Sequence, residues 1–130
     1  MRLIAAALLI LSMARIANGQ EATVARFVLF RCGDEFSGEE GKPRKYSGFY
    51  EAEFEESSFL VSHTNCQVWL TGDVCPIFAD GKCVKGAQVK AYVTVEGVLS
   101  PKGYYGHFGM WERELSVTRV MNVQRIKAPE

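Results

Sequence analysis

The chain has 130 residues, with 15 basic and 15 acidic side chains and a formal net charge of zero. This length suits a single domain. Binding to duplex nucleic acid requires a strongly basic surface, so we expect no duplex nucleic acid among its partners.

Residues 1–19 have the pattern of a secretory signal peptide. The basic residue Arg2 precedes an apolar run, and Ala17 to Gly19 provide small side chains before a cleavage point at Gln20. The apolar run is short for a membrane span, although an uncleaved N-terminal anchor is the alternative. We therefore expect an extracytoplasmic protein, periplasmic or secreted, with no membrane span after cleavage. The residue directly after the cleavage point is Gln20 and not a cysteine, so we expect no lipid anchor.

Removal of the signal peptide changes the charge balance only slightly. The leader contains Arg2 and Arg15 and no acidic residue, so the mature chain has 13 basic and 15 acidic residues and a net charge near −2. We expect residues 20–45 to form an N-terminal extension and loop, and residues 46–127 to form the folded domain.

The chain has four cysteines: Cys32, Cys66, Cys75 and Cys83. An even number of cysteines in a small exported chain predicts two disulfide bonds, for which three pairings exist. We favour Cys75–Cys83 because Pro76 and Asp80 mark a turn between them, which leaves Cys32–Cys66. A metal site is the alternative. It is disfavoured because the spacing lacks a C-x2-C pair and His63 is the only nearby histidine, so we expect no metal and no cofactor.

The spacing of apolar residues predicts β-strands at residues 46–55, 66–71, 87–99 and 113–125. In the first strand Tyr50, Ala52 and Phe54 share one face. Three glutamates, Glu51, Glu53 and Glu55, occupy the other face, where we expect solvent. Residues 26–32 or 59–61 are the two candidates for a fifth strand. Trp69 lies in the second predicted strand, and the pattern leaves open whether it packs inside or lies on the outer face.

The last two predicted strands differ in regularity. Val89, Ala91, Val93 and Val95 alternate with polar residues. Leu115, Val117, Met121 and Val123 also share one parity, but Arg119 interrupts that face. We expect a bulge near residues 118–120 to reconcile the pattern.

Residues 101–111, named here the aromatic loop, join these two strands and are rich in glycine and aromatic residues. Glycine allows backbone angles that other residues avoid, and aromatic side chains bury a large area. Two interpretations remain open. The loop either closes the end of a small barrel or presents a binding face.

The segment from Gly103 to Val120 resembles a motif of small exported bacterial proteins of unknown function. Their pattern is Tyr-Gly-His-Leu-Gly, an aromatic residue, Arg-Glu/Gln-Leu and Val-Thr. Here Phe108 replaces the leucine and Trp111 replaces a tyrosine. The resemblance extends from about Tyr46 onward and implies an OB-like fold, but no activity. With it, we predict an all-β, disulfide-stapled, small OB-like (Greek-key) barrel.

Three functions compete. The first is an exported, non-catalytic binding module of unknown ligand, with these candidate contacts: Trp69, Tyr105, His107, Trp111 and Arg113. The alternative is a structural or accessory protein-interaction subunit of the cell envelope with no small ligand. The third is a small hydrolase or lyase that uses His107 with a nearby carboxylate. Arg113 and Glu114 are adjacent in a predicted strand and point to opposite faces, which weakens a shared catalytic site.

Overall fold

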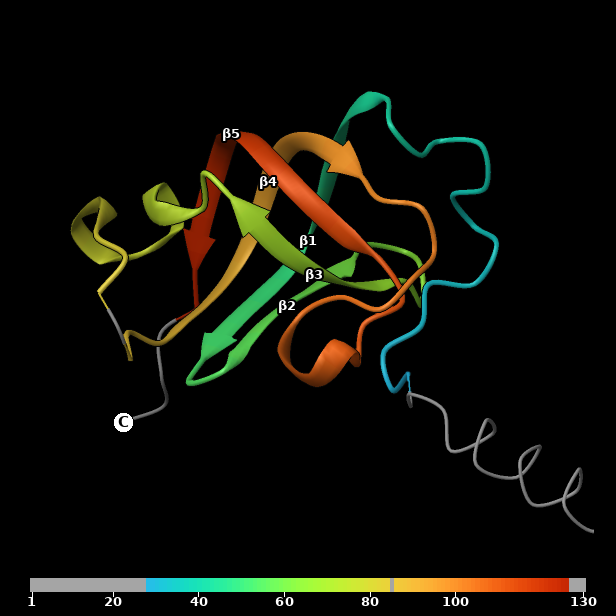
Figure 1. Cartoon of the computed structure of the whole chain (residues 1–130). Coiled ribbons are helices and arrows are strands. Elements are labelled where there is room, and N and C mark those ends of the chain that lie inside the picture. Colours follow the sequence, from blue (N-terminus) through green and yellow to red (C-terminus); the bar gives the residue numbers. More distant parts are fainter. Residues whose placement is uncertain (1–27, 85, 127–130) are drawn as a thin grey trace, which may run out of the picture.

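The computed structural model describes residues 28–84 and 86–126, which form five β-strands and three short 3₁₀ helices (Figure 1). The strands are β1 (Pro43–Glu53), β2 (Glu56–Val61), β3 (Gln67–Gly72), β4 (Val89–Leu99) and β5 (Glu114–Arg125). The helices are η1 (Cys75–Ile77), η2 (Ala79–Gly81) and η3 (His107–Gly109). None of the helices in this part of the chain has the length and hydrophobicity needed to cross a membrane. The predicted signal peptide lies outside the described residues.

The five described strands close into a barrel in the order β1-β2-β3-β5-β4. Strand β1 pairs antiparallel with both β2 and β4, and β4 pairs antiparallel with β5. The barrel closes where β3 and β5 run parallel over a short stretch, from Trp69 opposite Glu114 to Gly72 opposite Val117. The predicted all-β fold is therefore confirmed. Of the two candidates for the fifth strand, residues 59–61 form part of β2, whereas Phe30 makes only an isolated bridge to Trp111.

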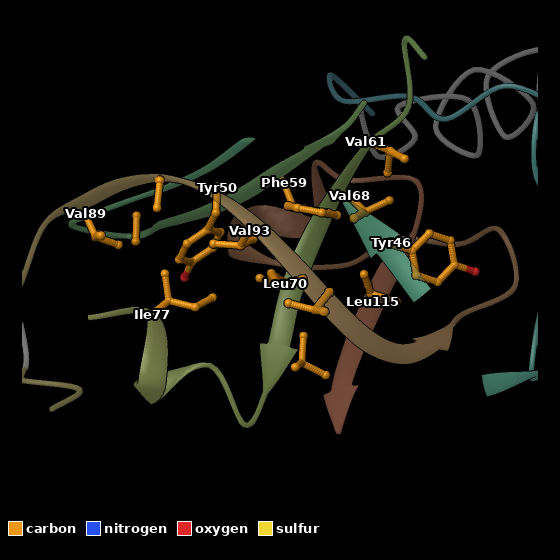
Figure 2. Close-up of a cluster of buried hydrophobic side chains, with 14 of the residues drawn as sticks. Tyr46, Tyr50, Phe59, Val61, Val68, Leu70, Ile77, Val89, Val93 and Leu115 are labelled. Atoms are coloured by element: carbon orange, nitrogen blue, oxygen red, sulfur yellow. The ribbon is translucent and has the colours of Figure 1, made fainter. Parts of the chain in front are cut away.

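Alternating side chains fill the barrel. Strand β4 contributes the predicted row, in which Ala91, Val93 and Val95 have no exposed surface. Strand β1 contributes Tyr46 and Tyr50, which are also buried. Figure 2 shows Tyr46, Tyr50 and Val93 in one cluster with labelled residues from β2, β3 and β5. Phe54 differs from the prediction. Strand β1 ends at Glu53, so Phe54 lies in the turn after it and is 69 % exposed.

Gly48 allows strands β1 and β2 to approach closely. A Cβ atom at this position would lie 2.1 Å from the carbonyl oxygen of Leu60, a separation that real Cβ atoms do not show. Only glycine fits there without a backbone shift, because glycine has no Cβ atom.

Strand β5 contains two bulges that decide which of its side chains face the core. The register with β4 skips Thr118 between the Val117 and Arg119 partners, and skips Met121 between the Val120 and Asn122 partners. Each extra residue reverses the alternation once. Val120 and Val123 therefore pack against the core, while Arg119 and Met121 are exposed. The bulge predicted near residues 118–120 is confirmed, and the bulge at Met121 is an additional one.

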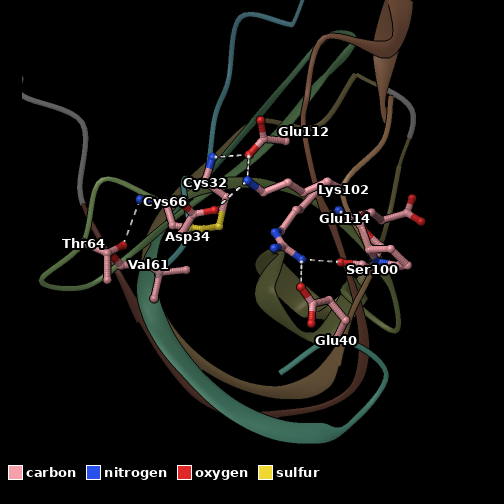
Figure 3. The surroundings of a disulfide bond; sticks show 12 residues. Cys32, Asp34, Glu40, Val61, Thr64, Cys66, Ser100, Lys102, Glu112 and Glu114 are labelled. Carbon is pink, nitrogen blue, oxygen red and sulfur yellow. Dashed lines mark hydrogen bonds and ion pairs between the residues drawn. A yellow bond between two sulfur atoms is a disulfide. The ribbon is translucent and has the colours of Figure 1, made fainter. Parts of the chain in front are cut away.

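The structure contains the two expected disulfide bonds, Cys32–Cys66 and Cys75–Cys83. Cys32–Cys66 is buried and ties the segment before β1 to the start of β3 (Figure 3). Beside it, Glu112 accepts a hydrogen bond from the Cys32 backbone N–H at 3.3 Å. Cys75–Cys83 encloses η1 and η2, whose buried Ile77 packs against the core.

We predict that the two disulfides contribute unequally to stability. Cys32–Cys66 joins residues 34 apart in sequence and Cys75–Cys83 joins residues 8 apart. The loop-entropy relation gives about 4 kcal/mol for the first bond and about 2.5 kcal/mol for the second. Replacing each pair by alanines, followed by urea unfolding, should show the larger loss for Cys32–Cys66. A larger loss for the Cys75–Cys83 pair would contradict this ranking.

Candidate functional site

Trp111 fixes the aromatic loop to the outside of the barrel. Its ring is 2 % exposed and stacks on Phe30, with ring centroids 4.3 Å apart. It also meets Trp69 of β3 edge to face at 4.7 Å. The indole N–H of Trp111 donates to the hydroxyl of Ser58 on β2 at 3.4 Å. The loop and the segment before β1 therefore cover the outer face of β2 and β3 around Ser58 and Trp69, and Trp69 is half-buried.

Gly106 lets the loop lie directly on the tryptophan pair. Its φ angle is 72°, in the left-handed region, and a Cβ atom would lie 2.5 Å from the Trp69 ring and 2.9 Å from the Trp111 ring. Glycine is required there for both reasons.

The loop is closed by hydrogen bonds of its own. Tyr105 and Trp111 exchange backbone hydrogen bonds of 2.9 and 3.1 Å. The Tyr105 hydroxyl donates to the carbonyl oxygen of Pro101 at 3.0 Å. Tyr105 is half-buried, and its phenol holds the loop closed.

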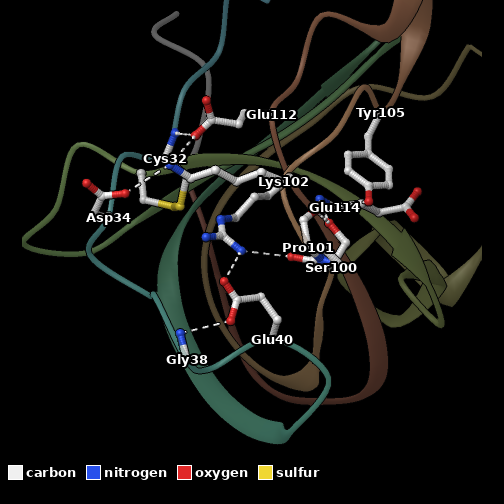
Figure 4. A network of polar contacts seen from close by, with 12 residues as sticks. Cys32, Asp34, Gly38, Glu40, Ser100, Pro101, Lys102, Tyr105, Glu112 and Glu114 are labelled. Atoms are coloured by element: carbon white, nitrogen blue, oxygen red, sulfur yellow. Dashed lines mark hydrogen bonds and ion pairs between the residues drawn. A yellow bond between two sulfur atoms is a disulfide. The ribbon is translucent and has the colours of Figure 1, made fainter.

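Arg113 is buried beneath the loop and is 1 % exposed. Its Nη1 lies 2.8 Å from Glu40 Oε1 and donates to the carbonyl oxygen of Ser100 at 2.9 Å. Figure 4 shows Glu40 and Ser100 in this network, with Gly38 donating to the other oxygen of Glu40. Hydrogen bonds from the backbone N–H of Glu40 and from Arg113 lower the pKa of the Glu40 carboxyl. Arg113 therefore joins the loop before β1 to the end of β4.

His107 links the aromatic loop to the turn between β1 and β2. Its Nε2 lies 3.0 Å from Glu55 Oε2, and both side chains are partly exposed. The residues next to this pair in the sequence are strongly exposed: Phe54 at 69 % and Phe108 at 79 %. We name these four residues, Phe54, Glu55, His107 and Phe108, the phenylalanine tip.

Two residues of the phenylalanine tip have left-handed backbone conformations. Glu55 has a φ angle of 62° and Phe108 a φ angle of 56°. Such angles are uncommon for residues other than glycine and are a genuine outlier for a bulky side chain. Strained residues of this kind cluster at functional sites.

Glutamates surround the turn that carries Phe54. Glu53 of β1 lies directly opposite Glu56 of β2 in the register of the two strands. Burial raises the pKa of the Glu56 carboxyl, the charges of Glu51 and Glu53 add to this effect, and the charge of Lys90 acts against it. Within the described part of the chain, neither Glu53 nor Glu56 forms an ion pair, whereas Glu51 lies 3.4 Å from Lys90. This end of the barrel is therefore acidic.

A groove of about 480 Å³ lies elsewhere, beside the start of β1. Phe36, Tyr46 and Val61 form part of its lining. Burial raises the pKa of the Tyr46 phenol, whose oxygen has no hydrogen-bond partner among the described residues. None of the residues predicted to bind ligand lines this groove. The described residues also contain no group of three or more His, Cys, Asp or Glu side chains placed to hold a metal ion.

The structure places the five predicted contact residues in one region but in different environments. Trp111 and Arg113 are buried and contact the chain itself, while Trp69 and Tyr105 are half-buried. His107 alone reaches the exposed tip. It pairs with Glu55 rather than with the neighbouring strand residues that we considered for a catalytic group.

Sequence reasoning missed Phe54 and Phe108 as surface residues. Phe54 continued an apolar alternation that predicted burial. Glu55 and Glu56 follow Phe54, and neither is a typical turn residue, so the sequence carried no clear signal of the turn.

No protein-family model, no curated protein and no solved structure matches this chain. The resemblance of residues 103–120 to exported bacterial proteins therefore stays a prediction.

The two tryptophans should differ in their accessibility to a small quencher. Trp111 is 2 % exposed, whereas Trp69 is half-buried. We expect acrylamide to quench the Trp111→Phe variant, which retains Trp69, more strongly than the Trp69→Phe variant. Unfolded samples in urea provide the control, because both variants should then be quenched equally. Equal quenching in the folded state would contradict the placement of Trp111.

The ionised carboxylate of Glu40 stabilises the folded protein, and this contribution should be lost in acid. Its pKa is lowered in the folded state, so its contribution is complete above the ordinary value of 4.5 and is lost as the pH falls through the folded pKa. Glu40→Gln should flatten the decline of the urea midpoint below that pH. Glu35→Gln, an exposed carboxyl of the same loop, is the matched control. An unchanged pH profile for Glu40→Gln would contradict the role of the Arg113 contact.

Proposed function

We propose that this chain is an exported, non-catalytic binding module with an OB-like barrel, and that it contacts a partner through the phenylalanine tip. The observation that carries the proposal is the joining of two loops by Glu55 and His107, each next to a strongly exposed phenylalanine. Exposed aromatic side chains grouped at one place are a feature of interaction sites.

The strand order supports the OB-like assignment. OB folds are five-stranded Greek-key barrels that use the face of strands 2 and 3 and the loops after strands 1 and 4 for binding. Here the order is β1-β2-β3-β5-β4, and the phenylalanine tip combines the loop after β1 with the loop after β4. Trp111 covers Ser58 and Trp69 on the outer face of β2 and β3, which favours binding at the loops over binding at that part of the face.

Two disulfide bonds support a location outside the cytoplasm, where disulfides form and persist. The signal-peptide pattern of residues 1–19 points to the same location, periplasmic or secreted, without a lipid anchor.

The surface position of the histidine supports a non-catalytic role. The Nε2 atom of His107 and the carboxylate of Glu55 lie on exposed loop ends. Acid–base catalysis usually relies on sites that exclude water and place two titratable groups in different environments.

The accessory-subunit alternative, which binds a protein and no small ligand, uses the same surface. Its specific support is that Phe54 and Phe108 project from loop ends, where another protein can cover them. The phenylalanine tip and its neighbouring glutamates line neither the groove beside β1 nor a second groove of about 360 Å³ at the end of β4. Neither groove therefore holds a small ligand against the tip.

A photo-cross-linking amino acid tests the proposal. We expect the reactive residue at position 108 or 54 to form a discrete cross-linked species in cells that export the protein. Val84, which is 63 % exposed in the segment after η2, is the control position. The same cross-linked species from position 84, or none from positions 54 and 108, would overturn the proposal.

A further inference from the structure

The phenylalanine tip presents apolar surface that the barrel does not use. Phe54 and Phe108 are 69 % and 79 % exposed, the highest values among the large apolar side chains that the structure describes. Moving an exposed phenylalanine ring out of water is favourable. Covering both rings therefore offers a substantial driving force for a partner.

The tip is organised in advance. The contact between His107 and Glu55 joins its two loops, and the turn of η3 is closed by a hydrogen bond of 3.0 Å from Gly109 N–H to the Gly106 carbonyl. Trp69 and Trp111 fix the base of the aromatic loop. A partner therefore does not have to order these residues when it binds, which removes part of the entropic cost of association.

The charge around the tip is unbalanced. Glu53 and Glu56 oppose each other across the hairpin without an ion pair among the described residues, and Glu55 follows in the turn. Like charges placed directly opposite each other destabilise a strand pair. A basic side chain from a partner would relieve this repulsion. The same charges disfavour acidic partners such as nucleic acids and anionic lipid surfaces.

We infer that the phenylalanine tip binds a polypeptide segment in which an apolar side chain is flanked by basic residues. The apolar side chain contacts Phe54 and Phe108, and the basic residues contact Glu53 and Glu56. The inference rests on the proposed function and adds the chemistry of the partner to it.

A titration followed by nuclear magnetic resonance tests this inference. The probe is a short synthetic peptide with leucine and phenylalanine between arginines, added to the oxidised, isotope-labelled mature protein. We expect shift changes centred on residues 53–56 and 107–108, and weaker binding at higher salt. A matched peptide with glutamates in place of the arginines should bind at least about tenfold more weakly. Equal binding of both peptides, or no shift change with either, would overturn the inference.

Two sets of variants separate the contribution of the glutamates to binding from that of the phenylalanines. Glu53→Lys with Glu56→Lys should weaken the arginine peptide by about tenfold or more, whereas Glu35→Lys, on the loop before β1, should not. Phe54→Ser with Phe108→Ser should also remove binding, and the exposure of both rings keeps this variant folded, as a thermal unfolding curve can verify. Phosphatidylcholine vesicles are the last arm. Shift changes at the tip with vesicles and none with the arginine peptide would overturn the inference in favour of a membrane surface.

The inference about a basic partner can fail while the proposed binding function stands, and the cross-linking experiment distinguishes the two cases. Cross-links from positions 54 and 108 that persist in the Glu53→Lys and Glu56→Lys variant would retain the binding module and reject the basic partner. Loss of the cross-links in that variant would support both.

Discussion

The position of Trp111 is the interaction on which the functional surface depends. One indole ring joins the segment before β1 through Phe30, strand β2 through Ser58 and strand β3 through Trp69. These contacts place the aromatic loop across the outside of the barrel instead of leaving it extended. The phenylalanine tip follows from this placement, because His107 reaches Glu55 only when the loop lies over β2 and β3. A buried aromatic anchor thus brings the loop that carries the exposed Phe108 to the hairpin that carries Phe54.

A second anchor acts on the other side of the same loop. The buried guanidinium of Arg113 joins Glu40, before β1, to the carbonyl group of Ser100, after β4. A charge in this position needs its partner, because an unpaired buried charge is strongly destabilising. Together with the Cys32–Cys66 bond, this contact makes the segment before β1 part of the domain. Trp111 and Arg113 both hold the aromatic loop in place, so its exposed end keeps a defined shape.

The contrast between buried and exposed aromatics changes how the aromatic loop is understood. A loop of this composition is compatible both with a plug and with a binding face, and the structure divides these roles between its residues. Trp111 and Tyr105 hold the loop in place, while Phe108 faces solvent. The proposed partner therefore meets the end of the loop, and its chemistry is set as much by the glutamates of the β1–β2 hairpin as by the loop itself.

The sequence by itself indicated four of the five described strands, because alternation with a period of two survives in the buried rows of β1 and β4, and it left β2 as one of two candidates for the fifth. It also favoured the observed disulfide pairing among three, since Pro76 and Asp80 mark a local turn, and it indicated a bulge where Arg119 breaks the pattern of β5. Only the tertiary structure decided that the chain before β1 bridges to Trp111, that Arg113 pairs with Glu40, and that Glu55 meets His107. These contacts join residues far apart in the chain, and periodicity reports only which face a residue occupies, not which distant residue covers it. The burial of Trp111 and the exposure of Phe108, three residues apart in one loop, were decided in the same way, by what the barrel placed beneath each ring.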